Sequence, residues 1–110
     1  MYDSILISIK KMLGLASDDD SFDIDIITHI NTIFMIVKQL GICPDNFYIT
    51  GEDEKWSDFI QNDADLVPIK TLIYARTKLI FDPPASSTLM QALKDTADEL
   101  EFRLRIEEDK

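Results

Sequence analysis

The sequence has very few of the residues on which covalent cross-links and catalytic centres depend. There is one cysteine, Cys43, and one histidine, His29, among 110 residues. A single cysteine excludes an internal disulfide and a four-cysteine zinc site, and one histidine leaves most nucleophile–base pairs without their parts. Three glycines and four prolines argue against a loop-rich all-β fold. No apolar run approaches the ~20 residues that a membrane-spanning helix requires.

Basic residues are also scarce relative to acidic ones. Eleven Lys and Arg face 21 Asp and Glu, which gives a formal net charge of −10. Basic residues drive binding to DNA and to anionic membranes, so we expect neither as a partner and expect another protein instead. The start of the chain has its lysines after the apolar stretch and no small-residue cleavage site. It therefore does not resemble a secretory signal, and we expect the protein to be made in the cytoplasm.

Apolar residues recur at helical spacing in four segments, of which three have clear ends. Asp3 or Ser4 can cap the first helix, and Gly14 can end it in the left-handed conformation. The second helix is expected over about residues 23–40. The third follows a cap at position 65 and runs to about position 81, where Asp-Pro-Pro stops it.

The fourth helix is expected to start at Ser86, Ser87 or Thr88, and Thr88 with Gln91 fits a capping box. Its apolar positions form one narrow stripe, made of Leu89, Met90, Leu93, Ala97, Leu100 and Leu104. We predict a core in which residues of three helices are buried together: Ile30, Phe34, Leu72, Leu93 and Leu100.

Residues 44–65 are the least regular part of the chain. Residues 47–49 favour an extended conformation, and Lys55 and Trp56 can pair back on them as a short hairpin. The predicted fold is therefore a single all-α domain over residues 1–110, with four helices and an irregular insertion between the second and the third.

Candidate catalytic and metal-binding residues are few. The acidic link of Asp18, Asp19 and Asp20 resembles a calcium loop, but it lacks the glycine and the glutamate that an EF-hand needs at loop positions six and twelve. It is better explained as a solvated link that caps a helix. His29 lies at the edge of an apolar face, and Cys43 lies in an apolar context. We predict no catalytic residue, no metal, no cofactor and no enzymatic activity.

Several apolar side chains indicate a contact surface. Phe102 and Ile106 lie one turn apart, on the side of the fourth helix away from its leucine stripe. Either a partner or the chain's own insertion can cover this pair, and the sequence leaves both open. The apolar side chains of the insertion favour a loop that docks on something, and its candidate contact residues are Phe47, Tyr48, Trp56 and Phe59.

Arg76 falls near the middle of the apolar arc of the third helix. A charge that faces the core must be paired with a carboxylate or extend to solvent. Within the chain, the expected partners are Asp23, Asp25 or Glu99; across a subunit interface, the partner is the acidic link 18–20 of a neighbouring copy. We favour the second arrangement, because many acidic copies crowded together must offset their repulsion.

Taken together, the pattern resembles the small head–tail connector proteins of long-tailed phages of Gram-positive bacteria. The most specific block is Phe81-Asp82-Pro83-Pro84 before a serine-rich helix start. Other blocks that carry the resemblance follow in order along the chain: Ile9-Lys10-Lys11-Met12-Leu13-Gly14, Phe22-Asp23-Ile24-Asp25-Ile26-Ile27-Thr28-His29-Ile30-Asn31, Gln39-Leu40-Gly41, Pro44-Asp45-Asn46-Phe47-Tyr48-Ile49, Trp56-Ser57-Asp58-Phe59-Ile60, and Ile73-Tyr74-Ala75-Arg76-Thr77-Lys78-Leu79-Ile80, which leads into Phe81-Asp82-Pro83-Pro84.

The resemblance implies a structural virion protein without enzymatic activity. Such a subunit assembles into a ring, typically of twelve copies, at the head–tail junction. The ring contacts the portal protein on one side and a downstream connector or tail-completion protein on the other, and DNA passes through its lumen without specific binding. The alternative is a small acidic regulator that mimics DNA and binds a host protein. A mimic would carry rows of carboxylates on one face and would stay monomeric or dimeric.

Overall fold

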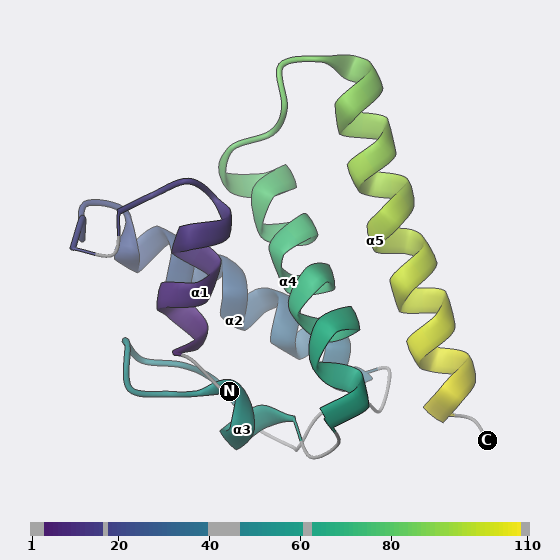
Figure 1. The fold of residues 1–110 in the computed structure, drawn as a ribbon, viewed down its shortest axis with the longest axis horizontal. Coiled ribbons are helices and arrows are strands. Elements are labelled where there is room, and N and C mark those ends of the chain that lie inside the picture. The colour runs from purple at the N-terminus through teal and green to yellow at the C-terminus, as the bar shows by residue number, and fades with distance from the viewer. Residues whose placement is uncertain (1–3, 17, 40–46, 61–62, 109–110) are drawn as a thin grey trace.

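The computed structural model describes residues 4–16, 18–39, 47–60 and 63–108, and within these residues it is helical without a strand (Figure 1). The predicted all-α class is therefore confirmed. The elements in chain order are α1 (Ile5–Met12), α2 (Asp23–Gln39), α3 (Trp56–Phe59), the 3₁₀ helix η1 (Asp63–Asp65), α4 (Leu66–Phe81) and α5 (Ser87–Glu108). The four longer helices are those expected from the sequence, and α3 and η1 lie within the insertion and at its end.

The ends of α1 follow its local signals. The Ser4 hydroxyl accepts a hydrogen bond from the Ile7 N–H at 3.3 Å, so Ser4 is the cap. Gly14, with φ of 86°, reverses the chain after the helix in the left-handed region. Between these ends Ile5, Leu6 and Ile9 are fully buried, as their spacing predicts.

The helix α4 lies at the centre of the fold, with α5 on one side and α1 and α2 on the other (Figure 1). It contributes Ile69, Leu72 and Ile73 to the core. The facing side of α2 is also buried, through Ile26, Ile30, Ile33, Phe34 and Val37. This central place explains the wide apolar arc of α4, because two sides of the helix are covered at once.

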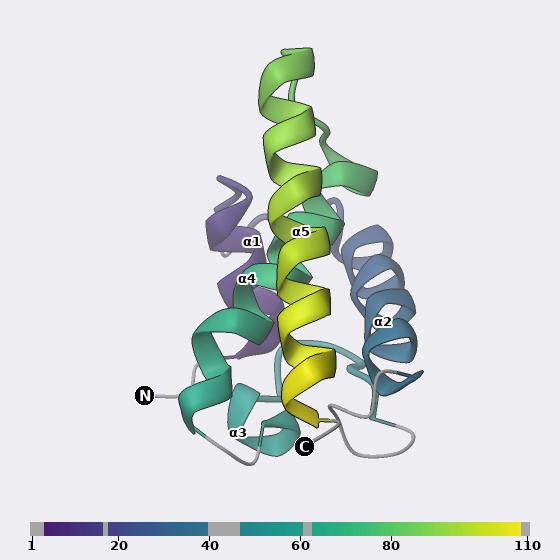
Figure 2. The same ribbon diagram turned by 90° about the vertical axis from the view of Figure 1, so that its right-hand side faces the viewer.

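The helix α5 is more peripheral than its leucine stripe predicts. Ala97 and Leu104 are buried, but Leu93 and Leu100 are only partly buried against the core. The first turns of α5 extend beyond the other helices (Figure 2), and Leu89 there is 62% exposed. Of the predicted core set, the members on α2 and α4 are thus confirmed as buried and the two on α5 lie at its edge.

The start of α5 differs in one detail from the expectation. The Ser86 hydroxyl accepts from the Leu89 N–H at 3.3 Å, so Ser86 holds the capping position. The Gln91 amide donates to Asp95 further along the helix. The Thr88–Gln91 capping box is therefore wrong, because a cap at Ser86 places Thr88 inside the first turn.

The insertion packs on its own chain. The rings of Phe34 and Phe59 have centroids 4.4 Å apart, and the Phe47 ring lies 5.3 Å from Phe34 and 5.0 Å from Phe59. α3 lies at the end of the bundle where α1 and α4 begin (Figure 1). The short hairpin does not form. Instead, Lys55 makes an antiparallel bridge with Ser4, at the start of α1.

Candidate interaction surfaces

Arg76 is held by two carboxylates of the same chain. It extends from α4 to α5, where its Nε donates to Glu101 Oε2 at 2.8 Å and its Nη2 donates to Asp98 Oδ1 at 2.7 Å. Burial lowers the pKa of Arg76, but the bonds to Glu101 and Asp98 outweigh it, so the pKa lies above its usual value. The two acids are three residues apart and share one face of α5.

The acids expected to pair with Arg76 have other partners or other places. Asp23 pairs with Lys10 at 2.8 Å, and Glu99 pairs with Arg103 on the outer side of α5. The pairing of Arg76 is thus internal, which corrects the arrangement with a neighbouring copy that we favoured. The physical reason is the register of α4 against α5, which turns positions 98 and 101, rather than 99, towards Arg76.

Most of the aromatic residues expected at an interface belong to the core of the chain itself. Trp56 and Phe59 are each 1% exposed, and Phe47 is partly buried against them. Trp56 and Phe59 thus pack on their own chain, and a partner contact of the insertion stays a prediction. Tyr48, which is 62% exposed, is the most accessible of its candidate contact residues.

The outer face of α5 carries the apolar surface that the sequence indicated. Phe102 is 53% exposed, so the described part of the insertion leaves about half of its side chain uncovered. The side chain of Ile106 lies outside the described residues. Further apolar side chains are exposed outside this face: Leu89 and Met90 in the leucine stripe of α5, and Ile80 at the end of α4. Whether this surface meets a partner stays a prediction.

The acidic link before α2 makes only local contacts. Asp19 Oδ1 accepts from the Ser21 N–H at 3.0 Å, and the hydrogen bonds from Ser21 lower the pKa of Asp19. Among the residues that the structure describes, no three His, Cys, Asp or Glu side chains are grouped closely enough to hold a metal ion. His29 is partly buried on α2, and Cys43 lies outside the described ranges.

None of the helices in the described ranges combines the length and the apolar character that crossing a bilayer requires.

Comparison with known proteins identifies the family. The family model described as phage connector protein matches residues 5–110. No curated protein and no solved structure matches the chain. The family match supports a structural connector role in the phage virion, in agreement with the all-α fold and with the sequence blocks that resemble head–tail connectors. The chain therefore belongs to the phage connector protein family.

Proposed function

We propose that this protein is a subunit of a dodecameric ring that joins the phage head to the tail. In this role it binds the portal protein on one side and a downstream connector or tail-completion protein on the other. The observation that carries the proposal is the family match over residues 5–110. The role is structural, so the chain catalyses no reaction and needs no cofactor.

The exposed apolar side chains of α5 support an assembled state. Phe102, Leu89 and Met90 lie on one long helix at the edge of the fold. Exposed apolar area costs free energy in water, and contact with a neighbouring subunit or with the portal would remove it. A peripheral helix with an uncovered outer face suits a subunit that is packed between neighbours.

The net charge supports passage of DNA without tight binding. With a formal charge of −10, the chain repels phosphates at long range. A lumen with acidic walls lets DNA move through, whereas basic walls would hold it.

The alternative of a DNA mimic gains no support from the described surface of α5. Asp98 and Glu101 are paired with Arg76, and Glu99 is paired with Arg103. A mimic needs carboxylates that remain free to imitate a row of phosphates. These acids instead join helices or stabilise one helix along its length.

Electron microscopy of portal-bearing particles tests the proposed function. Heads that lack this protein are mixed with the purified chain and averaged at the portal vertex. We expect a ring of added density below the portal and restored attachment of tails. Heads with the portal removed provide the control and should bind no chain. Unchanged density at the vertex, together with normal tail attachment by particles that lack the protein, would refute the connector role.

A further inference from the structure

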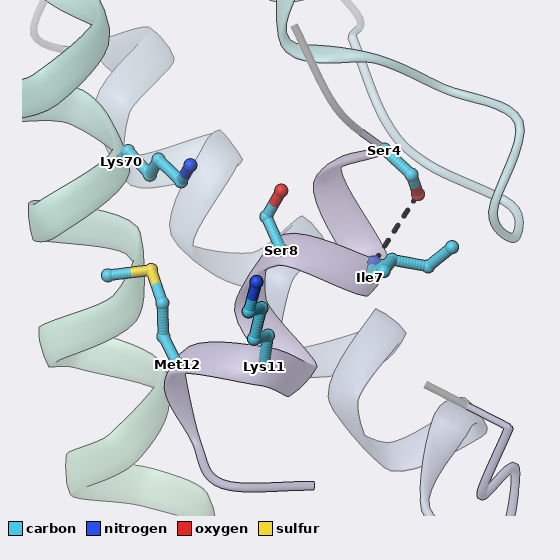
Figure 3. Close-up of a pocket in the computed structure, with 6 residues that line it drawn as sticks. All are labelled: Ser4, Ile7, Ser8, Lys11, Met12 and Lys70. Carbon is cyan, nitrogen blue, oxygen red and sulfur yellow. Dashed lines mark hydrogen bonds between the residues drawn. The ribbon is translucent and has the colours of Figure 1, made fainter. Parts of the chain in front are cut away.

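A hollow with basic walls lies between α1 and α4. Five of its six lining residues come from α1 or its cap, and the sixth comes from α4; they are Ser4, Ile7, Ser8, Lys11, Met12 and Lys70. Lys70 reaches across from α4 towards α1, and Lys11 lies along α1 towards Ser8 (Figure 3). Among the described residues, the hollow therefore has two ammonium groups on its walls and no acidic side chain in its lining.

Lys11 and Lys70 differ from Lys10 and Arg76 in their ionic partners. Lys10 pairs with Asp23, and Arg76 binds two acids, but neither Lys11 nor Lys70 has an ion pair with any residue in the described part of the chain. Lys70 Nζ lies 6.0 Å from the centroid of the Trp56 ring, which holds its side chain at the hollow. In a chain with 21 acids and 11 bases, two such lysines at one hollow make a local site for an anion.

The floor of the hollow has an unsatisfied polar group. Ser8 is only 6% exposed, and its hydroxyl has no hydrogen-bond partner within the described residues. The hydroxyl points away from α1 on the side that Lys70 approaches (Figure 3). A buried hydroxyl is normally hydrogen-bonded, so an oxygen acceptor that enters between the lysines would complete its bonding.

We propose that the hollow binds a carboxylate group from a second copy of this chain. The inference rests on the proposed function, because it requires copies that lie side by side. Copies with a charge of −10 repel one another. A carboxylate of one copy that meets Lys11 and Lys70 of the next offsets this repulsion, at lysines that have no ion pair among the described residues of their own chain.

The geometry of such a contact suits a ring. A head-to-tail contact arises when the carboxylate that fills the hollow comes from a different face of the neighbouring copy. Head-to-tail contacts repeat around an axis and close into a ring when the rotation permits. A phosphate of DNA is a less suitable ligand, because the net charge of the whole chain repels a polyanion.

Sedimentation tests the proposal on four proteins: the natural chain, the double variant Lys11→Gln with Lys70→Gln, the control Lys94→Gln, and the rescue variant Lys11→Arg with Lys70→Arg. Lys94 is an exposed lysine on α5 without an ion pair in the described ranges. Self-association is measured at rising concentration in 50 and 500 mM NaCl, both free and on portal-bearing heads. We expect at least tenfold weaker association of the double variant, unchanged association of the control, and rescue by Lys11→Arg with Lys70→Arg. High salt should weaken the natural assembly.

Mixing provides a second readout that a merely misfolded variant would not give. The double variant retains its own carboxylates, so it can occupy the hollow of a natural copy but cannot accept the next one. Equal mixtures should therefore give short, terminated assemblies. Circular dichroism checks that the variant keeps its helicity.

Each other outcome overturns the proposal. It is wrong if the double variant assembles like the natural chain, or if the natural chain forms no contact between copies under any of these conditions. If a short DNA duplex or inorganic phosphate binds only when both lysines are present while assembly of the double variant is unchanged, the hollow is a phosphate site and the proposal is overturned. Binding of single natural copies to portal-bearing heads is scored separately, so the connector role can hold when the hollow fails.

Discussion

The side-chain amide of Asn31 on α2 binds both backbone polar groups of Ile49. Asn31 Nδ2 donates to the Ile49 carbonyl at 3.0 Å, and Asn31 Oδ1 accepts from the Ile49 N–H at 2.8 Å. These are the two bonds that a neighbouring strand would otherwise supply. With Ile49 fully buried, the pair fixes the start of the insertion on α2.

Replacement of Asn31 should therefore loosen the insertion. Asn31→Ala leaves two backbone groups of Ile49 without their partner, and we expect it to lower the free energy of unfolding by about 2 kcal/mol. The control is Thr32→Ala, which removes an exposed hydroxyl bonded one turn back to Thr28 and should cost less than about 0.5 kcal/mol. Urea unfolding measures both, and equal costs would show that the amide does not hold Ile49.

Removal of the Arg76 charge should destabilise the isolated chain by a modest amount. Arg76→Met keeps the apolar part of the side chain but leaves Glu101 and Asp98 without their cation. Since the Asp98 side chain is 57% exposed, water screens part of this loss, and we expect a cost of about 1–2 kcal/mol. Arg103→Met, at an exposed pair within α5, should change stability by less than about 0.5 kcal/mol. A monomer as stable as the natural chain would contradict the internal pairing.

Local sequence signals were sufficient for the helices but not for the contacts between them. Ser4 and Gly14 end α1 where a cap and a left-handed residue were expected, because both act on their own backbone. The partner of Arg76 depends on how α4 is set against α5, and one position along a helix turns a side chain by about 100°. Glu99 was therefore chosen where Asp98 and Glu101 lie.

The contacts of the insertion are also hard to predict from local signals, because they depend on how separate segments pack together. Asn31 lies among the polar positions of α2, where a solvated side chain was the simple interpretation, yet it binds Ile49. Lys10 lies in the last turn of α1, where the helix dipole alone favours a cation, but it is buried and paired with Asp23. In sequence, an aromatic residue of an irregular segment is compatible with contact to a partner and with burial in the chain's own core. For Trp56, the packing seen in the structure shows burial in the core.

Because the insertion packs into the core, replacement of its buried Trp56 should lower the free energy of unfolding much more than replacement of its exposed Tyr48. Trp56→Ala empties a fully buried site and should cost about 3–5 kcal/mol. Tyr48→Ala removes an exposed ring and should change the free energy of unfolding by less than about 0.5 kcal/mol. Urea unfolding followed by circular dichroism distinguishes them. A stable, fully helical Trp56→Ala protein would mean that the insertion does not close the core.

Acid should weaken the turn that leads into α3. Burial raises the pKa of Glu54, but hydrogen bonds outweigh it and hold the pKa below its usual value; they come from the Thr50 hydroxyl at 2.8 Å and the Gly51 N–H at 3.3 Å. The resulting stability is present above the unfolded pKa of about 4.3 and is lost as the pH falls through the lower folded pKa. Glu54→Gln should flatten this part of the pH profile. If the free energy of unfolding of the natural chain and of Glu54→Gln changed in parallel between pH 3 and 6, Glu54 would not be the source of the pH dependence.

The exposed ring of Phe102 predicts a variant that folds but does not assemble. Phe102→Ser changes a half-exposed side chain on the outer face of α5, so the melting temperature of the monomer should stay within about 2 °C of the natural value. If this face meets a neighbour or the portal, loss of a buried aromatic ring should weaken attachment to portal-bearing heads at least tenfold. Ile24→Ser, at an 81% exposed apolar residue at the start of α2, is the matched control and should attach normally. Normal attachment of Phe102→Ser would place the subunit contact elsewhere, and unfolding of the variant would show that Phe102 supports the fold.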